Sequence, residues 1–177
     1  LTRNIAQRFN SIYGDVFTVP EGYFGKVGSR IMSLQEPTRK MSKSDPDDCY
    51  IAILDPEDAI RRKIKRAVTD SDGEIRYDPE NKPGVSNLLS IIAAMSGQEI
   101  DSVVSDLQGQ GYGALKNRCT EVVLDTLLPI QTEHARLMAD KGYLQSILDE
   151  NAQRANYLAQ KTLRKIQKKV GFAARQG

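Results

Sequence analysis

Apolar side chains recur every three or four residues along most of this sequence, which is the spacing of helices that bury one face. The pattern predicts helical stretches at residues 1–14, 55–68, 85–96, 100–107 and 114–139, and a last long one from Gly142 to Val170. Pro129 should kink or divide the fifth stretch, because proline removes a backbone donor and clashes with the preceding turn. Helices joined by short connections predict a bundle.

The first part of the chain has a different pattern. Residues 15–19 and 30–34 are rich in β-forming side chains and are predicted as short strands, and residues 50–54 as a brief extended piece. The second predicted strand leads directly into a loop that contains several lysines. A strand followed by a polar loop places that loop at the edge of a sheet, where α/β proteins bind ligands.

Composition limits the class of protein. A chain of 177 residues with 40% hydrophobic and 27% charged side chains is typical of one or two ordinary globular domains. No apolar run approaches the ~20 residues that a membrane span needs, and no secretory signal pattern is present. Cys49 and Cys119 lack the spacing of a zinc site, so we expect two ordinary thiols in a reducing, cytoplasmic setting without a metal.

The loop at residues 39–45 reads Arg-Lys-Met-Ser-Lys-Ser-Asp and is the strongest chemical feature of the chain. Lys40 and Lys43 each carry a compact ammonium group on a flexible stem, which suits phosphate oxygens. On a mobile loop, two such groups can close over a polyphosphate and stabilise the charge that develops as it departs. A solvated basic loop is the alternative reading of the same residues.

Positive charge is also clustered elsewhere, although the net charge is only +2. Local clusters matter more than the sum for attracting a polyanion. One cluster lies in the second predicted helix and the other near the C-terminus: Arg61, Arg62, Lys63, Lys65 and Arg66; Lys161, Arg164, Lys165, Lys168, Lys169 and Arg175. Each can be a solvated helix face or a contact to RNA phosphates.

The lysine loop, Lys40-Met41-Ser42-Lys43-Ser44, resembles the signature loop of class I aminoacyl-tRNA synthetases. The likeness continues on both sides of the loop, through Ser29–Leu34, Pro37–Arg39, Ile64–Ser71, Lys82–Leu89 and Gly111–Gly113. Together these segments resemble the bacterial tryptophanyl-tRNA synthetases, from residue 1 to about residue 172.

The resemblance implies a mainly α fold in two parts. Residues 1–48 would end a Rossmann-like α/β catalytic domain, and residues 49–177 would form a helical-bundle anticodon-binding domain with a long C-terminal helix. The loop would close on ATP, with Lys40 and Lys43 as catalytic residues and Lys43 as the principal phosphate contact. The implied ATP-binding set, with the backbone at Ile31 against the adenine, is Ile31, Lys40, Met41, Ser42, Lys43 and Ser44. Mg²⁺ would accompany ATP, without a protein-bound metal site.

The resemblance also implies partners. The complete enzyme would be a homodimer, away from membranes, that activates tryptophan with ATP and transfers it to tRNA(Trp). The residues assigned to tRNA binding are Arg61, Arg62, Lys65 and Arg118. Reading a single-stranded anticodon loop needs stacking platforms and base-edge donors. Tyr112, Asn117, Arg118 and Gln131 are chemically suitable, and the sequence does not select among them.

One departure from the family bears on activity. The histidine-glycine ATP motif of these enzymes is absent, and Leu1 already lies in a helical pattern with no cap before it. We therefore expect a cut chain, a C-terminal fragment that alone neither activates tryptophan nor charges tRNA. Two alternatives stay open: a helical RNA-binding or interaction module without ATP chemistry, and a fragment of the related tyrosine enzyme.

The remaining polar candidates have structural interpretations. His134 lies within an apolar stripe and is predicted to be a partly buried structural residue rather than a catalytic one. The acidic pairs Asp47-Asp48 and Asp70/Asp72 have the positions of turn and cap residues, and no acid–base pair is predicted.

Overall fold

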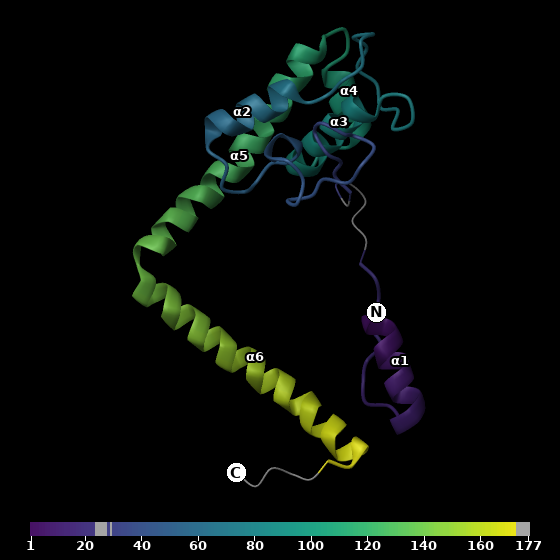
Figure 1. Ribbon diagram of the computed structural model, residues 1–177, viewed down its shortest axis with the longest axis vertical. Helices are drawn as coiled ribbons and strands as arrows, with labels where there is room; N and C mark the ends of the chain where they lie inside the picture. Colours follow the sequence, from purple (N-terminus) through teal and green to yellow (C-terminus); the bar gives the residue numbers. More distant parts are fainter. Residues whose placement is uncertain (24–27, 29, 173–177) are drawn as a thin grey trace. The chain divides into compact units, whose positions relative to one another are not determined.

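A computed structural model describes residues 1–23, 28 and 30–172 (Figure 1). Its elements in chain order are α1 (Thr2–Tyr13), a 3₁₀ turn η1 (Asp47–Cys49), α2 (Glu57–Arg66), α3 (Pro83–Ser96), α4 (Ile100–Asp106), α5 (Tyr112–Ala139) and α6 (Lys141–Val170). Within these residues the only β-type pairing is an isolated bridge between Met32 and Lys40. The predicted mainly α fold is confirmed, and its assignment to the end of a Rossmann-like domain stays a prediction.

The chain forms two compact units, Leu1–Tyr23 with Arg136–Gly177, and Phe24–Ala135. The first unit contains α1 and α6. Its core is slight: Ala6 is the buried residue of α1, and no side chain of α6 is buried among the described residues. The second unit contains the lysine loop together with α2, α3, α4 and most of α5. The predicted domain limit between residues 48 and 49 lies inside this second unit and stays a prediction.

The core of the second unit surrounds α3, which lies among α2, α4 and α5 (Figure 1). Nine of the fourteen residues of α3 are buried, so this helix is covered on nearly all sides. α2 and α5 each contribute one apolar face, and Leu34 joins the same cluster from the segment before the lysine loop. The segment that carries the loop therefore packs directly on the helical core.

Gly84 allows the start of α3 to approach the backbone of residues 68 and 69. A Cβ atom at Gly84 would lie 2.1 Å from the carbonyl oxygen of Val68, which no side chain can tolerate. The amide of Val68 in turn donates to the carbonyl of Leu34. Residues 68 and 69 therefore contact both the start of α3 and the segment around Leu34.

The predicted strands at 15–19 and 30–34 are wrong. The backbone of the first segment is satisfied by the side chain of Asn10, whose Oδ1 accepts from the amides of Val16 and Phe17 and whose Nδ2 donates to the carbonyl of Phe17. The second segment forms only the Met32–Lys40 bridge. Residues 50–54 contain no strand either, although Tyr50 is extended.

The helix predictions hold more closely. Each predicted helix is present, with ends that differ by a few residues, and Pro129 does not divide α5, which runs unbroken from Tyr112 to Ala139. His134 is exposed, so its predicted partial burial is wrong. Val68, the last residue of the predicted stretch at 55–68, is 43% exposed because α2 ends before it, at Arg66. Among the described residues, no helix has the length and apolar run required to cross a membrane.

Candidate functional site

The base of the lysine loop is a two-rung antiparallel ladder. The amide of Met41 donates to the carbonyl of Ile31 over 3.0 Å, and the amide of Ser33 donates to the carbonyl of Arg39 over 2.8 Å. Met32 and Lys40 face each other between these two bonds. The ladder fixes the backbone of residues 39–41, which lead into the turn that carries Lys43.

The loop itself turns through its serines. The Ser42 hydroxyl accepts from the amide of Ser44, and the Ser42 carbonyl accepts from the amide of Asp45. Lys40 and Lys43 are exposed, and within the described part of the chain neither ammonium group has an ion-pair partner. Asp45, the carboxylate of this loop, is paired with Arg39, so the two ammonium groups are chemically ready to bind a polyanion.

Met41 is anchored differently. Its side chain is half-buried, packs on the helical core, and lines an apolar cavity of about 320 Å³. The cavity is walled chiefly by side chains of the loop base, the 51–53 segment, α3 and α5: Gly28, Ile31, Met41, Ile51, Ile53, Ile91, Ala94, Met95 and Leu127. Ile31 also faces this cavity, so its side chain packs while its backbone belongs to the ladder. Its predicted contact with adenine stays a prediction.

The far end of the loop is held by ion pairs. Arg39 bonds Asp45 across the loop and Glu36 before it. Two residues beyond Asp45, the carboxylate of Asp47 accepts from Nζ of Lys63 over 2.8 Å, and Asp55 accepts from the same ammonium over 2.7 Å. The loop therefore lies between a ladder at its start and a buried lysine of α2 after its end.

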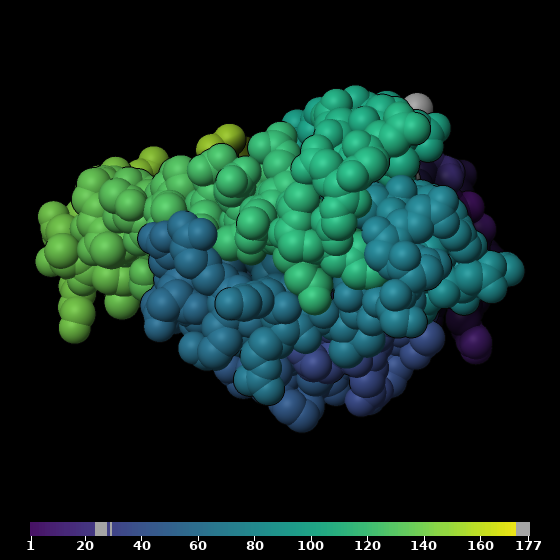
Figure 2. Space-filling model, turned by 90° about the horizontal axis from the view of Figure 1, so that it is seen from above, coloured from purple at the N-terminus to yellow at the C-terminus, as the bar shows by residue number. Residues whose placement is uncertain are grey.

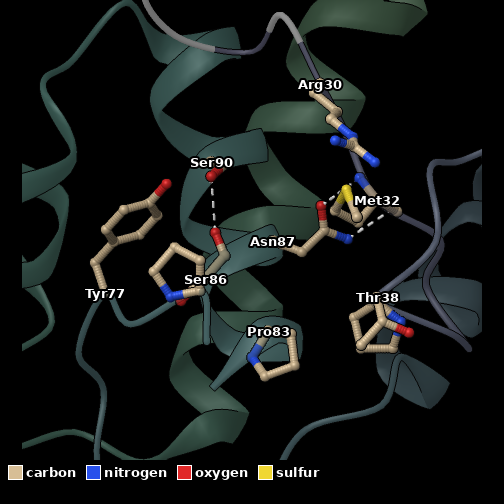
Figure 3. Close-up of a pocket in the computed structure, with 10 residues that line it drawn as sticks. Arg30, Met32, Thr38, Tyr77, Pro83, Ser86, Asn87 and Ser90 are labelled. Atoms are coloured by element: carbon tan, nitrogen blue, oxygen red, sulfur yellow. Dashed lines mark hydrogen bonds between the residues drawn. The ribbon is translucent and has the colours of Figure 1, made fainter. Parts of the chain in front are cut away.

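A second cavity, of about 380 Å³, lies on the other side of the Met32 backbone, between that segment, the 77–83 loop and α3 (Figure 3). The side-chain amide of Asn87 reaches from α3 to the backbone of Met32 at the wall of this cavity, with two hydrogen bonds of 2.8 Å. The prediction from sequence missed Asn87. The available signal is an amide side chain inside a helix whose other polar residues are all serines.

Lys82 is a second buried lysine that sequence reasoning missed. Its ammonium group, 2% exposed, is surrounded by the carboxylates of Asp70 and Asp72, the carbonyl of Glu74 and the hydroxyl of Tyr112. Burial lowers the pKa of Lys82, but its hydrogen bonds with Asp72, Tyr112 and Asp70 outweigh burial and raise the pKa overall. Burial and the hydrogen bond with Asp70 raise the pKa of Tyr112 to about 12. This cluster organises the 70–82 loop and ties it to the start of α5.

The four predicted tRNA-binding residues are not equivalent. Arg61 is paired with Glu57 one turn away, over 2.5 Å, and Arg62 and Lys65 are exposed on the same helix. Arg118, on α5, is 44% exposed and has a long contact of 3.8 Å with Glu121. α2 and α5 lie side by side in this unit (Figure 2), so three of the four flank a common surface.

Two cavities open on that surface, and Asn117 lines both. One, of about 270 Å³, is flanked by basic side chains of α2 and α5: Arg61, Lys65, Gly113, Lys116, Asn117 and Thr120. The other, of about 460 Å³, is rich in amide groups: Gln98, Val103, Asp106, Leu107, Gln110, Ala114, Asn117, Arg118 and Glu121. The arrangement offers cations for phosphates next to amides for base edges.

Two of the four residues that are chemically suited to base reading have their polar groups hydrogen-bonded within the protein. The amide of Gln131 donates to the carbonyls of Ile53 and Asp55, and the hydroxyl of Tyr112 belongs to the Lys82 cluster. Lys116, which the sequence did not single out, donates to the carbonyls of Lys65 and Ala67, and burial lowers its pKa. Lys116 thus caps the end of α2, whose last carbonyls carry partial negative charge.

The cysteines and acidic residues do not form a metal site. Within the described residues, no three histidine, cysteine, aspartate or glutamate side chains are grouped so that they could hold a metal ion. Both cysteines are buried thiols, and burial raises the pKa of Cys119 to about 12. A thiol with so high a pKa stays protonated at neutral pH and is a poor nucleophile.

Comparison with known proteins identifies the family. The sequence profile of the tRNA synthetases class I (W and Y) matches residues 1–127, so the chain belongs to this family. Within it, the similar curated relatives are tryptophan–tRNA ligases. Those of Halalkalibacterium halodurans and Bacillus subtilis are 49% and 48% identical over 173 residues, which is 97% of this chain and 52% of each relative.

Solved structures give the same result. The crystal structure of tryptophanyl-tRNA synthetase from Mycoplasma pneumoniae aligns with a TM-score of 0.85 at 28% identity, over 97% of this chain and 52% of that one. The enzyme from Campylobacter jejuni, complexed with ADP and tryptophan, aligns with a TM-score of 0.62 at 28% identity. The chain spans about half the length of the curated relatives that it matches.

Proposed function

We propose that this chain supplies the lysine loop and the helical tRNA-binding region of a tryptophan–tRNA ligase. The observation that carries the proposal is the loop at Lys40–Ser44, which is fixed at both ends and whose two ammonium groups have no ion-pair partner among the described residues. Membership of the class I family and the high identity to tryptophan–tRNA ligases support it.

In the proposed reaction, a carboxylate oxygen of tryptophan attacks the α-phosphorus of ATP. A new oxygen–phosphorus bond forms as the bond between the α-phosphorus and the α,β-bridging oxygen breaks, and the β- and γ-phosphates leave together as pyrophosphate with the electron pair. Lys43 and Lys40 stabilise the charge that accumulates on the departing phosphates. Mg²⁺ accompanies ATP as part of the substrate. A hydroxyl of tRNA(Trp) then attacks the carbonyl carbon of the tryptophanyl-adenylate, and AMP leaves as the aminoacyl ester forms.

The remaining assignments belong to the same proposal. Ile31, Met41, Ser42 and Ser44 shape the ATP side of the loop, and residues 49–177 act as the anticodon-binding domain after a catalytic part that includes residues 1–48. The enzyme acts as a homodimer in the cytoplasm. These points rest on the family and on the position of the loop, and each can be tested separately.

Pyrophosphate exchange on the complete gene product tests the proposal. With ATP and labelled pyrophosphate, we expect exchange that depends on tryptophan and is not supported by tyrosine. Exchange that depends on tyrosine would assign the chain to the tyrosine enzyme. Absence of exchange with either amino acid, together with retained tRNA binding, would favour a helical RNA-binding module and overturn the proposal.

A further inference from the structure

The N–H and C=O groups of Met32 point away from the lysine loop. In an antiparallel pair, a residue that faces its partner between two ladder bonds directs its own backbone groups to the opposite side. Met32 occupies this position opposite Lys40, because the ladder bonds are made by the neighbouring residues. In a sheet, a further strand would pair with these groups, and without one they would be unsatisfied.

Asn87 takes the place of that strand. Its Oδ1 accepts from the amide of Met32 and its Nδ2 donates to the carbonyl of Met32, each over 2.8 Å (Figure 3). A side-chain amide has one donor group and one acceptor, so it can pair with a peptide unit as another peptide would. Leucine offers neither bond, and an ionised aspartate can accept but cannot donate.

The amide of Asn87 is held rigidly. Asn87 is 4% exposed, and its neighbours Val85, Leu88 and Leu89 on α3 are 0–1% exposed in the core. A side chain fixed by such packing can transmit the position of its helix to whatever it binds. α3 therefore determines where the Met32 backbone lies. Because Met32 pairs with Lys40 in the ladder, the position of Lys40 depends on α3 as well.

We propose that Asn87 is a positioning residue, which holds the base of the lysine loop where Lys40 and Lys43 meet the phosphates of ATP. The inference rests on the proposed function, because it concerns the same loop. Asn87 touches neither substrate nor reacting atoms in this role. Its contribution is geometric: it holds the Met32 backbone, and through the ladder Lys40, in place, and a shift of about 1 Å at a catalytic group can reduce a rate by about 100-fold.

The test uses Asn87→Leu and Asn87→Asp in the complete gene product. Ser90→Ala is the matched control, because Ser90 lies one turn further along α3 and its hydroxyl donates to the Ser86 carbonyl of its own helix rather than to the Met32 backbone. In tryptophan-dependent pyrophosphate exchange, we expect both Asn87 variants to lower kcat by about 10- to 100-fold, with the KM for tryptophan nearly unchanged. Ser90→Ala should retain the wild-type kcat.

A second measurement does not depend on activity. Hydrogen exchange of the Met41 and Ser33 amides reports the two ladder bonds, and we expect faster exchange there in both Asn87 variants, with no change in peptides from α5. Faster exchange throughout the unit would show a general loss of fold and overturn the inference. Wild-type kcat and wild-type ladder exchange in both variants would also overturn it.

The two proposals can fail separately. If the wild-type protein shows no exchange of pyrophosphate, the proposed function fails, while the hydrogen-exchange result still decides whether Asn87 holds the ladder. If the wild-type protein is active and the Asn87 variants match it, the proposed function stands and the role of Asn87 is rejected.

Discussion

The Nζ atom of Lys63 lies 2.8 Å from Oδ1 of Asp47, although Lys63 is fully buried and the Asp47 side chain is 66% exposed. Asp55, at 2.7 Å and 14% exposed, completes the pairing, and the ring of Tyr50 lies 5.0 Å from the ammonium group. Burial lowers the pKa of Lys63, and its bonds with Asp47 and Asp55 raise it above its ordinary value overall. Lys63 therefore stays protonated at neutral pH, and its ion pairs hold the segment after the lysine loop against α2.

Lys63→Met should destabilise the protein by about 3 kcal/mol, because removing one partner leaves the half-buried Asp55 carboxylate without its cation. Arg61→Met is the matched control on the same helix, where an exposed pair with Glu57 should be worth less than about 1 kcal/mol. Urea unfolding of the complete gene product measures both. Equal losses of stability in the two variants would show that the buried ion pair contributes no more than the exposed one.

The burial of Lys63 could have been predicted from the sequence, because helical spacing indicates which face of a helix each residue lies on. Lys63 follows Ile60 by three residues and precedes Ala67 by four, so it lies on the buried stripe of α2. Grouping Lys63 with its basic neighbours uses its charge and not its position on the helix. Ile60 and Ile64, which lie on the same stripe, are fully buried as well.

The links between distant segments could not be predicted in this way. Asn87 and Met32 are 55 residues apart, and Lys82 and Tyr112 are 30 apart. Periodicity places a side chain on a face of its own helix, but it does not specify the loop that the face meets. The predicted strands failed for a related reason, because the side chains of Asn10 and Asn87 supply the backbone partners that a sheet would have supplied.

Asp72→Asn should reduce the dependence of stability on pH in acid. The hydrogen bond from Lys82 holds the pKa of Asp72 well below its usual range, whereas in the unfolded chain the group titrates near about 3.9. A lowered pKa in the folded state gives stability that is present above the unfolded value and is lost as the pH falls below it. The wild-type urea midpoint should therefore drop between pH 6 and pH 3.

In Asp72→Asn this drop should be smaller. Asp125→Asn is the control, since Asp125 is exposed on α5, away from the Lys82 cluster. Urea midpoints of all three proteins are compared at both pH values. An unchanged drop in Asp72→Asn would mean that this pair does not contribute to acid sensitivity.

Lys43→Ala should reduce kcat for tryptophan-dependent pyrophosphate exchange by about 100- to 1,000-fold, the usual effect of removing a preorganised charge from a transition state. Lys40→Ala should have an effect in the same direction. Both side chains are exposed and without ion-pair partners in the described residues, so their loss should leave the urea midpoint unchanged. A fall in stability with unchanged kcat would assign the loop a structural role.

Lys65→Gln and Arg118→Gln should weaken binding of tRNA(Trp) and reduce its dependence on salt. Each phosphate contact to a single strand contributes about 0.7 to the slope of log affinity against log salt. Lys65 flanks the basic cavity and Arg118 the amide-rich one, and Asn117 lines both. Asn117→Ala should therefore lower affinity with little change of slope, because a neutral amide releases no counterion.

Two further substitutions separate RNA contact from structure. Arg76→Gln should leave tRNA affinity unchanged, because Arg76 is paired with Glu74 and Asp78 in another loop. Lys116→Gln should lower the urea midpoint, because its ammonium group caps α2 through the carbonyls of Lys65 and Ala67. Filter binding over a range of salt measures every variant. If Arg76→Gln weakens binding as much as Lys65→Gln and Arg118→Gln, the charge of the whole unit attracts the RNA, and the surface of α2 and α5 has no special role.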